Sequence, residues 1–383
     1  MKTLKSILFV AVTIVAFSCR GEINSNTAYS STPNPEPLTS KHFIKVALLL
    51  DTSNSMDGLI DQAKAQLWEI VNELSHAKCR NTRPNLQIAL YEYGNDNLSE
   101  RNGYIRKILN FTEDLDDVSK ELFSLTTNGG SEYCGAVIKS SIKELDWGKN
   151  ADDLKMIFIA GNEPFSQGKI NYKDAVMEAR ENDIVVNTIF CGDYKHGISS
   201  EWQRGAQLAY GDYMAINHNQ HTVHIASPYD DMILQLNIKL NETYVPYGSR
   251  GRMKIAVQEE QDANAVDYNK ANAVSRTVTK GSHLYKNSSW DLVDAEKEKD
   301  FSYDELKKED LPEILKGKTK AEIKTYVAEK RQQRVEIQNK IKELNVKRQA
   351  FIDTKKGEHD NALESAMIKA LRTQAEKKNY TWQ

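Results

Sequence analysis

The chain has 383 residues, of which 40% are apolar and 27% are charged, and its formal net charge is −3. This length and apolar fraction suit two folded units in a globular protein, and a near-neutral charge gives no general case for binding nucleic acids or other polyanions. Four cysteines exclude a disulfide-rich scaffold, and no apolar run after the first twenty residues is long enough to span a bilayer as a helix.

The N-terminus has the pattern of an export signal. Two lysines precede an apolar run over residues 7–17, which is too short for a membrane-spanning helix and typical of a secretory signal. A serine and then Cys19 follow, which resembles the bacterial lipoprotein signal, where this cysteine becomes the lipid-carrying N-terminus. We therefore expect a signal peptide over 1–18 and a lipidated, flexible tether over 19–41. An ordinary signal peptide that contains a cysteine is the alternative.

Lipid attached at Cys19 places the chain in a bacterial cell envelope, since several acyl chains make a stable anchor. Arg20 follows the cysteine, and the absence of an aspartate at this position favours the outer membrane.

Residues 43–50 (FIKVALLL) are an apolar run typical of a strand that is buried on both faces of a parallel sheet. The polar loop DTSNSMDG follows, and apolar residues at helical spacing come after it. The loop therefore lies at the carboxyl end of a central strand, where open α/β sheets bind ligands. Asp51, Ser53 and Ser55 are hard oxygen donors spaced two residues apart, which suits Mg²⁺. Simple helix capping explains one of these residues but not all three.

The segment VALLLDTSNSMDGLIDQAKAQL resembles the von Willebrand factor type A (VWA) family and matches the first motif of its metal-ion-dependent adhesion site (MIDAS). The resemblance implies a doubly wound, mostly parallel α/β sheet, similar to a Rossmann fold, over residues 42–246. It also implies a divalent cation, either Mg²⁺ or Mn²⁺ or Ca²⁺, whose coordination shell is completed by a carboxylate from a partner protein.

Two further motifs of the family match less well. NGGSEYCGAV places Ser131 where the family often has the threonine of Gly-Gly-Thr, although a glycine-rich turn with Ser131 as a helix cap is the alternative. MIFIAGNEP places Ala160, Gly161 and Asn162 where the family usually has Thr-Asp-Gly. Asn162 or Glu163 then has to supply the missing oxygen, and a site without it loses negative charge and affinity.

Strands and helices alternate along the rest of this segment, as a doubly wound sheet requires. We expect strands over 86–93, 184–190 and 213–216, and a buried strand followed by a turn within 156–164. Helices are expected over 112–125, 172–181, 199–211 and 228–244. Met232, Leu234, Leu236 and Leu240 are expected on the inward face of the last helix. Cys134 and Cys191 are expected at the same edge of the sheet, either joined in a disulfide or as buried free thiols.

The last third of the chain has a different pattern. Residues 247–318 are mixed in composition and indicate a linker or docking segment. Thr319 and Glu322 form a capping box that opens a long amphipathic helix, and a second helix is expected over 361–378. Residues 319–383 are thus either a helical hairpin packed on itself or on the main domain, or a coiled-coil-like arm for a partner or for self-association.

No nucleophile–base set, phosphate loop or metalloprotease motif occurs in the sequence, so we expect no enzyme. The leading hypothesis is a membrane-anchored module that binds a protein partner through the metal site. The alternative is a metal-free structural scaffold of an envelope complex, assembled through the C-terminal helices. Nucleic acid is not an expected partner, because the basic residues of the C-terminal region are interleaved with acidic ones.

Overall fold

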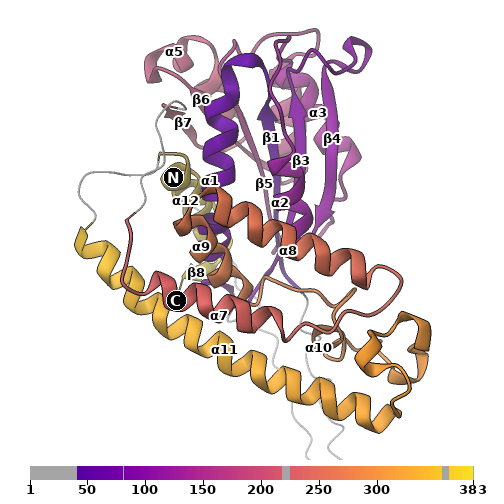
Figure 1. The fold of residues 1–383 in the computed structure, drawn as a ribbon. Coiled ribbons are helices and arrows are strands. Elements are labelled where there is room, and N and C mark those ends of the chain that lie inside the picture. Colours follow the sequence, from indigo (N-terminus) through magenta and orange to yellow (C-terminus); the bar gives the residue numbers. More distant parts are fainter. Residues whose placement is uncertain (1–40, 81, 218–224, 356–361, 383) are drawn as a thin grey trace, which may run out of the picture. The chain divides into compact units, whose positions relative to one another are not determined.

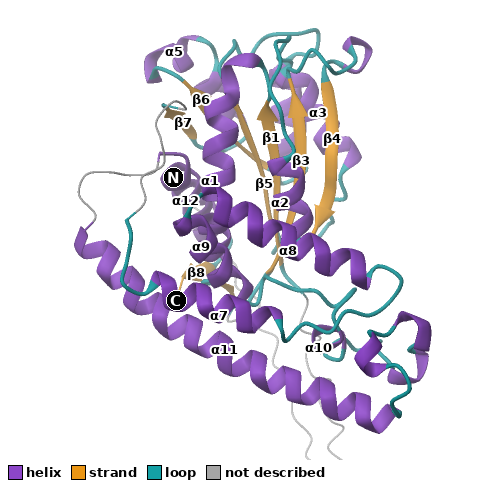
Figure 2. Cartoon of the chain, viewed as in Figure 1, coloured by secondary structure: helices purple, strands orange, loops and turns teal. Residues whose placement is uncertain are grey.

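A six-stranded sheet lies at the centre of the computed structural model, which describes residues 41–80, 82–217, 225–355 and 362–382. The expected signal peptide, the tether and Cys19 lie outside the described residues. The strand order is β4-β3-β1-β5-β6-β7; the pairings from β3 to β7 are parallel, and the edge strand β4 pairs antiparallel with β3 (Figure 2). The strands are β1 (Phe43–Asp51), β3 (Asn85–Tyr93), β4 (Ile105–Thr112), β5 (Leu154–Gly161), β6 (Val185–Cys191) and β7 (Tyr213–Ile216).

Helices cover both faces of the sheet (Figure 1). One face carries α1 (Asp57–Leu74), α2 (Leu115–Phe123) and the C-terminal α12 (Ala362–Glu376). The other face carries α3 (Cys134–Glu144), α4 (Tyr172–Glu181) and α6 (Trp202–Leu208), with the short α5 (Tyr194–Ser199) before α6. All eight residues of β5 are buried, which explains why the central strands are nearly continuous apolar runs in the sequence. The predicted fold class, a mostly parallel α/β sheet followed by a helical region, is confirmed.

The strand β4 was not expected from the sequence. Its side chains are mostly half-buried because it lies at the edge of the sheet, so it lacks the apolar run that marks the central strands. The helix expected over 112–125 begins only at Leu115, where the Asp114 side chain accepts hydrogen bonds from the backbone N–H groups of Asp116 and Asp117.

The helix expected over 228–244 does not complete the sheet. It forms as α7 (Asp230–Asn241) but packs against α9 (Lys270–Lys280) and α11 (Lys320–Lys355). The expected inward face is therefore wrong in part: Ile233 and Leu240 are buried, whereas Met232 is 43% exposed. The reason lies far along the chain, because α12 takes the place on the sheet beside α1 and β7.

Residues 247–318 contain two helices that the sequence pattern did not reveal, α8 (Gly251–Tyr268) and α9. The buried face of α9 is largely polar and includes Arg276 and Lys280, so apolar periodicity cannot identify it. After α9 the chain returns to the core, where Trp290 is buried against Tyr244. The short α10 (Leu292–Ala295) follows, and 3-10 turns lie at Asn54–Met56, Glu100–Asn102, Tyr303–Glu305, Lys308–Asp310 and Glu313–Leu315.

The two C-terminal helices pack separately on the rest of the fold. The long helix α11 contacts α7, α9 and α10, and α12 contacts α1 (Figure 1). The last strand, β8 (Tyr380–Trp382), pairs antiparallel with β2 (Ala77–Cys79). Residues 41–383 form one compact unit, so the division of this unit at residues 246 and 318 stays a prediction. None of the described helices combines the length and the apolar character that a membrane span needs.

Candidate functional site

Loops from neighbouring strands meet at the carboxyl edge of the sheet. The backbone oxygen of Thr52, in the loop after β1, accepts a hydrogen bond from the N–H of Asn128 at 3.0 Å and from Asn95 Nδ2 at 3.3 Å. Asn95 follows β3, and its Nδ2 also donates to the oxygen of Thr126 at 2.9 Å. These bonds hold the β1 and β3 loops and the segment before α3 together, so their side chains face a shared site.

Asp51 lies at the bottom of this site, at the end of β1. Its side chain is fully buried, and Oδ1 accepts a hydrogen bond from the Ser53 N–H at 2.7 Å. Oδ2 is also buried and has no hydrogen-bond partner among the described residues. A buried carboxylate oxygen without a partner is costly, by about 1–3 kcal/mol or more, and a proton, a cation or a donor bound there removes this cost.

Two serine hydroxyls and an amide lie near this carboxylate. Ser53 Oγ and Ser55 Oγ are 3.4 Å apart, and Asn162 Nδ2, from the loop after β5, donates to Ser55 Oγ at 3.0 Å. The other polar atom of that amide, Asn162 Oδ1, is buried and without a partner among the described residues. Two oxygens that lack donors thus share the site with two hydroxyls.

Glu132 is a second buried carboxyl that the sequence analysis missed. Its carboxyl lies beside Asp51 and Ser53, and Oε2 accepts the Glu163 N–H at 3.3 Å. Burial raises the pKa of Asp51 well above its usual range, and the negative charge of Glu132 raises it further. Burial likewise raises the pKa of Glu132. The pair therefore favours any positive charge that comes between the two carboxyls, either a proton or a cation.

Two glycines make room for these carboxyls. Gly94 has a φ of +81°, and a Cβ at this position would lie 2.7 Å from Glu132 Cγ and 2.9 Å from Asp51 Oδ1. A Cβ on Gly161 would lie 2.6 Å from the Tyr93 hydroxyl and 3.1 Å from Asp51 Oδ2. Gly161 itself carries no side chain, and the second carboxyl beside Asp51 belongs to Glu132.

The remaining predicted site residues lie differently. Ser131 is half-buried, and no hydrogen bond joins its side chain to this group within the described part of the chain. Glu163 contributes its backbone N–H to Glu132, while its side chain is exposed. Glu132 directly follows Ser131 in the Gly-Gly-Ser-Glu sequence. This position next to an expected site residue is the sequence feature that could have identified Glu132.

Cys134 and Cys191 are buried free thiols, so the disulfide that the sequence allowed does not form. The physical reason is that Cys134 belongs to the core on the α3 side of the sheet and Cys191 to the core on the α1 side. Cys134 Sγ lies 3.8 Å from the Tyr93 hydroxyl, and burial raises the pKa of both thiols well above the usual range.

The donor set of the site is dominated by oxygen atoms. Within the described ranges no group of three or more His, Cys, Asp or Glu side chains gathers in a way that could hold a metal ion. A cation at this edge of the sheet therefore needs the serine hydroxyls and the amide in addition to the two carboxyls, a set that suits Mg²⁺, Mn²⁺ or Ca²⁺ better than Zn²⁺.

Comparisons with known proteins identify the domain that carries this site. The von Willebrand factor type A domain model matches residues 45–198, and no curated protein matches the chain. The solved structure of BatB from Bacteroides thetaiotaomicron is 16% identical with a TM-score of 0.35, over 45% of this chain and 90% of BatB. The VWA domain of SpRpn10 is 13% identical with a TM-score of 0.34, over 47% of this chain and 99% of that domain.

Proximal thread matrix protein 1 from the mussel byssus, solved with a zinc-occupied MIDAS motif, is 14% identical with a TM-score of 0.37. The match covers 47% of this chain and 43% of the mussel protein, so this chain spans less than half of that protein's length. The family match, the sheet topology and the Asp-x-Ser-x-Ser loop after β1 agree with one another. Residues 45–198 of this chain are a von Willebrand factor type A domain.

Proposed function

We propose that this VWA domain is a non-catalytic binding module that engages a protein partner through a divalent cation. The cation, Mg²⁺ or else Mn²⁺ or Ca²⁺, is held by Asp51, Ser53 and Ser55. Glu132 and Asn162 complete the protein's share of the site. The observation that carries this proposal is the buried Asp51 Oδ2, which has no donor among the described residues and lies beside a second buried carboxyl.

The residues fit a hard divalent cation. Two carboxyls supply up to two negative charges, and the Ser53 N–H holds the Asp51 carboxylate in a fixed orientation through Oδ1. A bound cation supplies an electrophilic position that a carboxylate of the partner can occupy. Because Gly161 replaces the usual aspartate, Glu132 is the residue that restores the charge of the site.

The attachment to a membrane is the second part of the proposal. We infer that lipid on Cys19 anchors the chain in a bacterial cell envelope, in the outer membrane, with residues 19–41 as the tether. The support is the signal pattern of the N-terminus. Replacing Cys19 by alanine should move the chain from the membrane fraction to the soluble fraction of lysed cells, and an unchanged distribution would contradict the lipid anchor.

One observation favours a second function. The Asp51 and Glu132 carboxyls lie beside each other and burial raises the pKa of both, so a shared proton can close the site without a cation. In that case the domain is a metal-free scaffold of an envelope complex, and the exposed Val335 and Val346 on α11 are candidates for self-association. Light scattering on the double variant Val335→Asp/Val346→Asp tests this function, since a scaffold assembled through α11 should lose its oligomer.

Calorimetric titration with Mn²⁺ distinguishes the two functions. We expect the parent chain to bind one cation, Asp51→Ala to lose binding, and Glu132→Gln to bind about 10–100-fold more weakly. Glu163→Gln is the matched control, because its side chain is exposed and its backbone N–H is retained. Circular dichroism verifies that each variant is folded. A parent chain that binds no Mn²⁺, or an Asp51→Ala variant that binds it unchanged, rules out the cation.

The partner is sought in a pull-down from detergent-solubilised envelopes, with and without EDTA. A partner that binds through the cation is lost with EDTA and with Asp51→Ala, and it is retained with Glu163→Gln. A partner that survives both treatments binds elsewhere and contradicts the metal bridge.

A further inference from the structure

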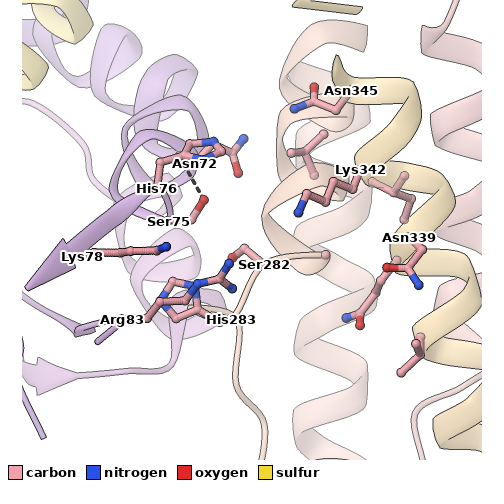
Figure 3. A pocket seen from close by; sticks show the side chains of 15 residues that line it. Asn72, Ser75, His76, Lys78, Arg83, Ser282, His283, Asn339, Lys342 and Asn345 are labelled. Carbon is pink, nitrogen blue, oxygen red and sulfur yellow. Dashed lines mark hydrogen bonds between the residues drawn. The ribbon is translucent and has the colours of Figure 1, made fainter. Parts of the chain in front are cut away.

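A cleft of 530 Å³ lies between the VWA domain and α11, and the metal site does not use it. Figure 3 shows its two walls. One is formed by the C-terminal end of α1, by β2 and the loop that leads to β3, and by Ser282 and His283 after α9, and α11 forms the other. Helix α9 packs against both α1 and α11. The cleft is at the opposite end of α1 from Asp51, and the 18 residues of this helix separate the two by about 27 Å.

The side chains that line the cleft are basic or neutral. Lys78, Arg83 and Lys342 are cationic, and none of the 15 described lining residues is Asp or Glu. Arg83 and Lys342 lie on opposite walls, and the Lys342 ammonium group is directed across the cleft (Figure 3). Two or more positive charges that face each other without an acid between them repel unless an anion is present.

Arg83 and Lys342 have no partner within the described part of the protein. Arg83 and Lys342 form no ion pair or hydrogen bond with the residues that the structure describes, although 20 ion pairs occur elsewhere in those residues. Many other lysines and arginines of the described residues, in contrast, form salt bridges.

Arg83 and Lys342 are also not needed to neutralise helix ends. Both α1 and α9 end at the cleft, and the partial negative charge of a helix C-terminus attracts cations. Most of their last carbonyl groups are already satisfied: Asn72 O accepts from Ser75 Oγ at 2.6 Å, and Lys280 O accepts from Gln338 Nε2 at 3.2 Å. Backbone N–H groups satisfy the carbonyls of Glu73, Val278 and Thr279.

The rest of the lining suits the remainder of a polar organic molecule. Asn339 and Asn345 on α11 offer amide groups, and Asn345 Oδ1 is buried without a hydrogen-bond partner in the described part of the chain. Val278 and Ile341 add apolar surface. A volume of 530 Å³ is within the range of small-molecule sites.

We propose that this cleft binds a small phosphorylated organic molecule, with its phosphate between Arg83 and Lys342. The guanidinium group offers a planar pair of N–H donors and the ammonium a mobile point charge, and both bind phosphate oxygens well. The amides of Asn339 and Asn345 contact the rest of the molecule. Because the ligand bridges the two walls, its binding fastens α11 to the VWA domain.

The test is calorimetry with inorganic pyrophosphate at constant ionic strength, in buffer with EDTA so that the metal site takes no part. We expect saturable binding of one pyrophosphate to the parent chain, and about tenfold weaker binding to Arg83→Gln and to Lys342→Gln. Lys340→Gln is the matched control: it lies on the same helix, does not line the cleft and should bind within twofold of the parent. Citrate, a tricarboxylate, should bind at least tenfold more weakly than pyrophosphate.

A second readout follows the bridging itself. Bound pyrophosphate should slow amide hydrogen exchange in residues 335–345 of α11, and this effect should be absent in Lys342→Gln. The proposal is overturned by a parent chain without saturable binding, by citrate that binds as tightly as pyrophosphate, or by an equal loss of binding in Lys340→Gln. Asp51→Ala should bind pyrophosphate like the parent, so failure of the metal site and failure of this cleft are separate results.

Discussion

Arg334 holds the long helix α11 on the rest of the fold, and replacing it tests that contact directly. The side chain is 4% exposed, and Nη1 lies 2.6 Å from Asp291 Oδ2. Nη2 donates to the backbone oxygen of Thr243 at 2.8 Å, and the guanidinium carbon lies 4.2 Å from the centre of the Tyr244 ring. Asp291 is fully buried, so neither charge of the pair is solvated by water.

We expect Arg334→Met to lower the free energy of unfolding by about 3 kcal/mol. Loss of one partner from a buried ion pair costs about 3–5 kcal/mol, because the other charge stays buried without compensation. Asp291 keeps two backbone donors, the N–H groups of Val245 at 2.7 Å and Asp294 at 3.1 Å, which places the loss at the lower end of this range. Methionine fills much of the space of the arginine stem, so the decrease in the free energy of unfolding comes mainly from removal of the guanidinium charge.

Urea unfolding followed by circular dichroism measures this loss. Arg331→Met is the control: Arg331 is on the same helix and pairs with Glu296 at 2.7 Å, but it is 49% exposed, so its loss should cost about 0–1 kcal/mol. Combining Arg334→Met with Asp291→Asn should cost at least about 1 kcal/mol less than the sum of the single changes. A cost below about 1 kcal/mol for Arg334→Met, or strict additivity, would refute the reasoning.

Three further predictions concern other buried groups. Burial lowers the pKa of His283 to about 4 from 6.5, helped by Arg83, Lys286 and His76. Between these pH values the unfolded chain binds more protons, so this histidine destabilises the fold as the pH falls from 6.5 to 4. Urea titrations at pH 7.5 and pH 4 measure how much free energy of unfolding is lost between these pH values, and this loss should be about 1–2 kcal/mol smaller in His283→Gln than in the parent chain. An equal loss in the two chains would disprove this role of His283. Gly161→Ala should cost about 1–3 kcal/mol in the same assay, since its Cβ would lie 2.6 Å from the Tyr93 hydroxyl; an unchanged midpoint would contradict that close contact. Cys79, Cys134 and Cys191 should resist a thiol reagent in the native chain and react after unfolding, with mass spectrometry to locate the label; rapid native labelling of Cys134 or Cys191 would contradict their burial.

The sequence alone predicts the sheet and the first loop of the site. The central strands are apolar on both faces, and Asp51, Ser53 and Ser55 come from one short segment, so local pattern and spacing are sufficient to find them. The strand β7 and the helix α4 have the bounds that were expected from the sequence. In each of them the spacing of the apolar residues places these residues together against the core.

The tertiary structure decides which distant segments join that framework. Glu132 is identified as a site residue only because the segment before α3 meets the β1 loop, and α12 covers the sheet although it is more than 100 residues beyond the VWA match. Helix α9 buries Arg276 and helix α11 buries Arg334. Each pairs with an aspartate that is distant in the sequence and that only folding brings close. Hydrophobic periodicity reports burial of apolar groups only, whereas burial of a paired charge depends on a partner that the local sequence does not specify.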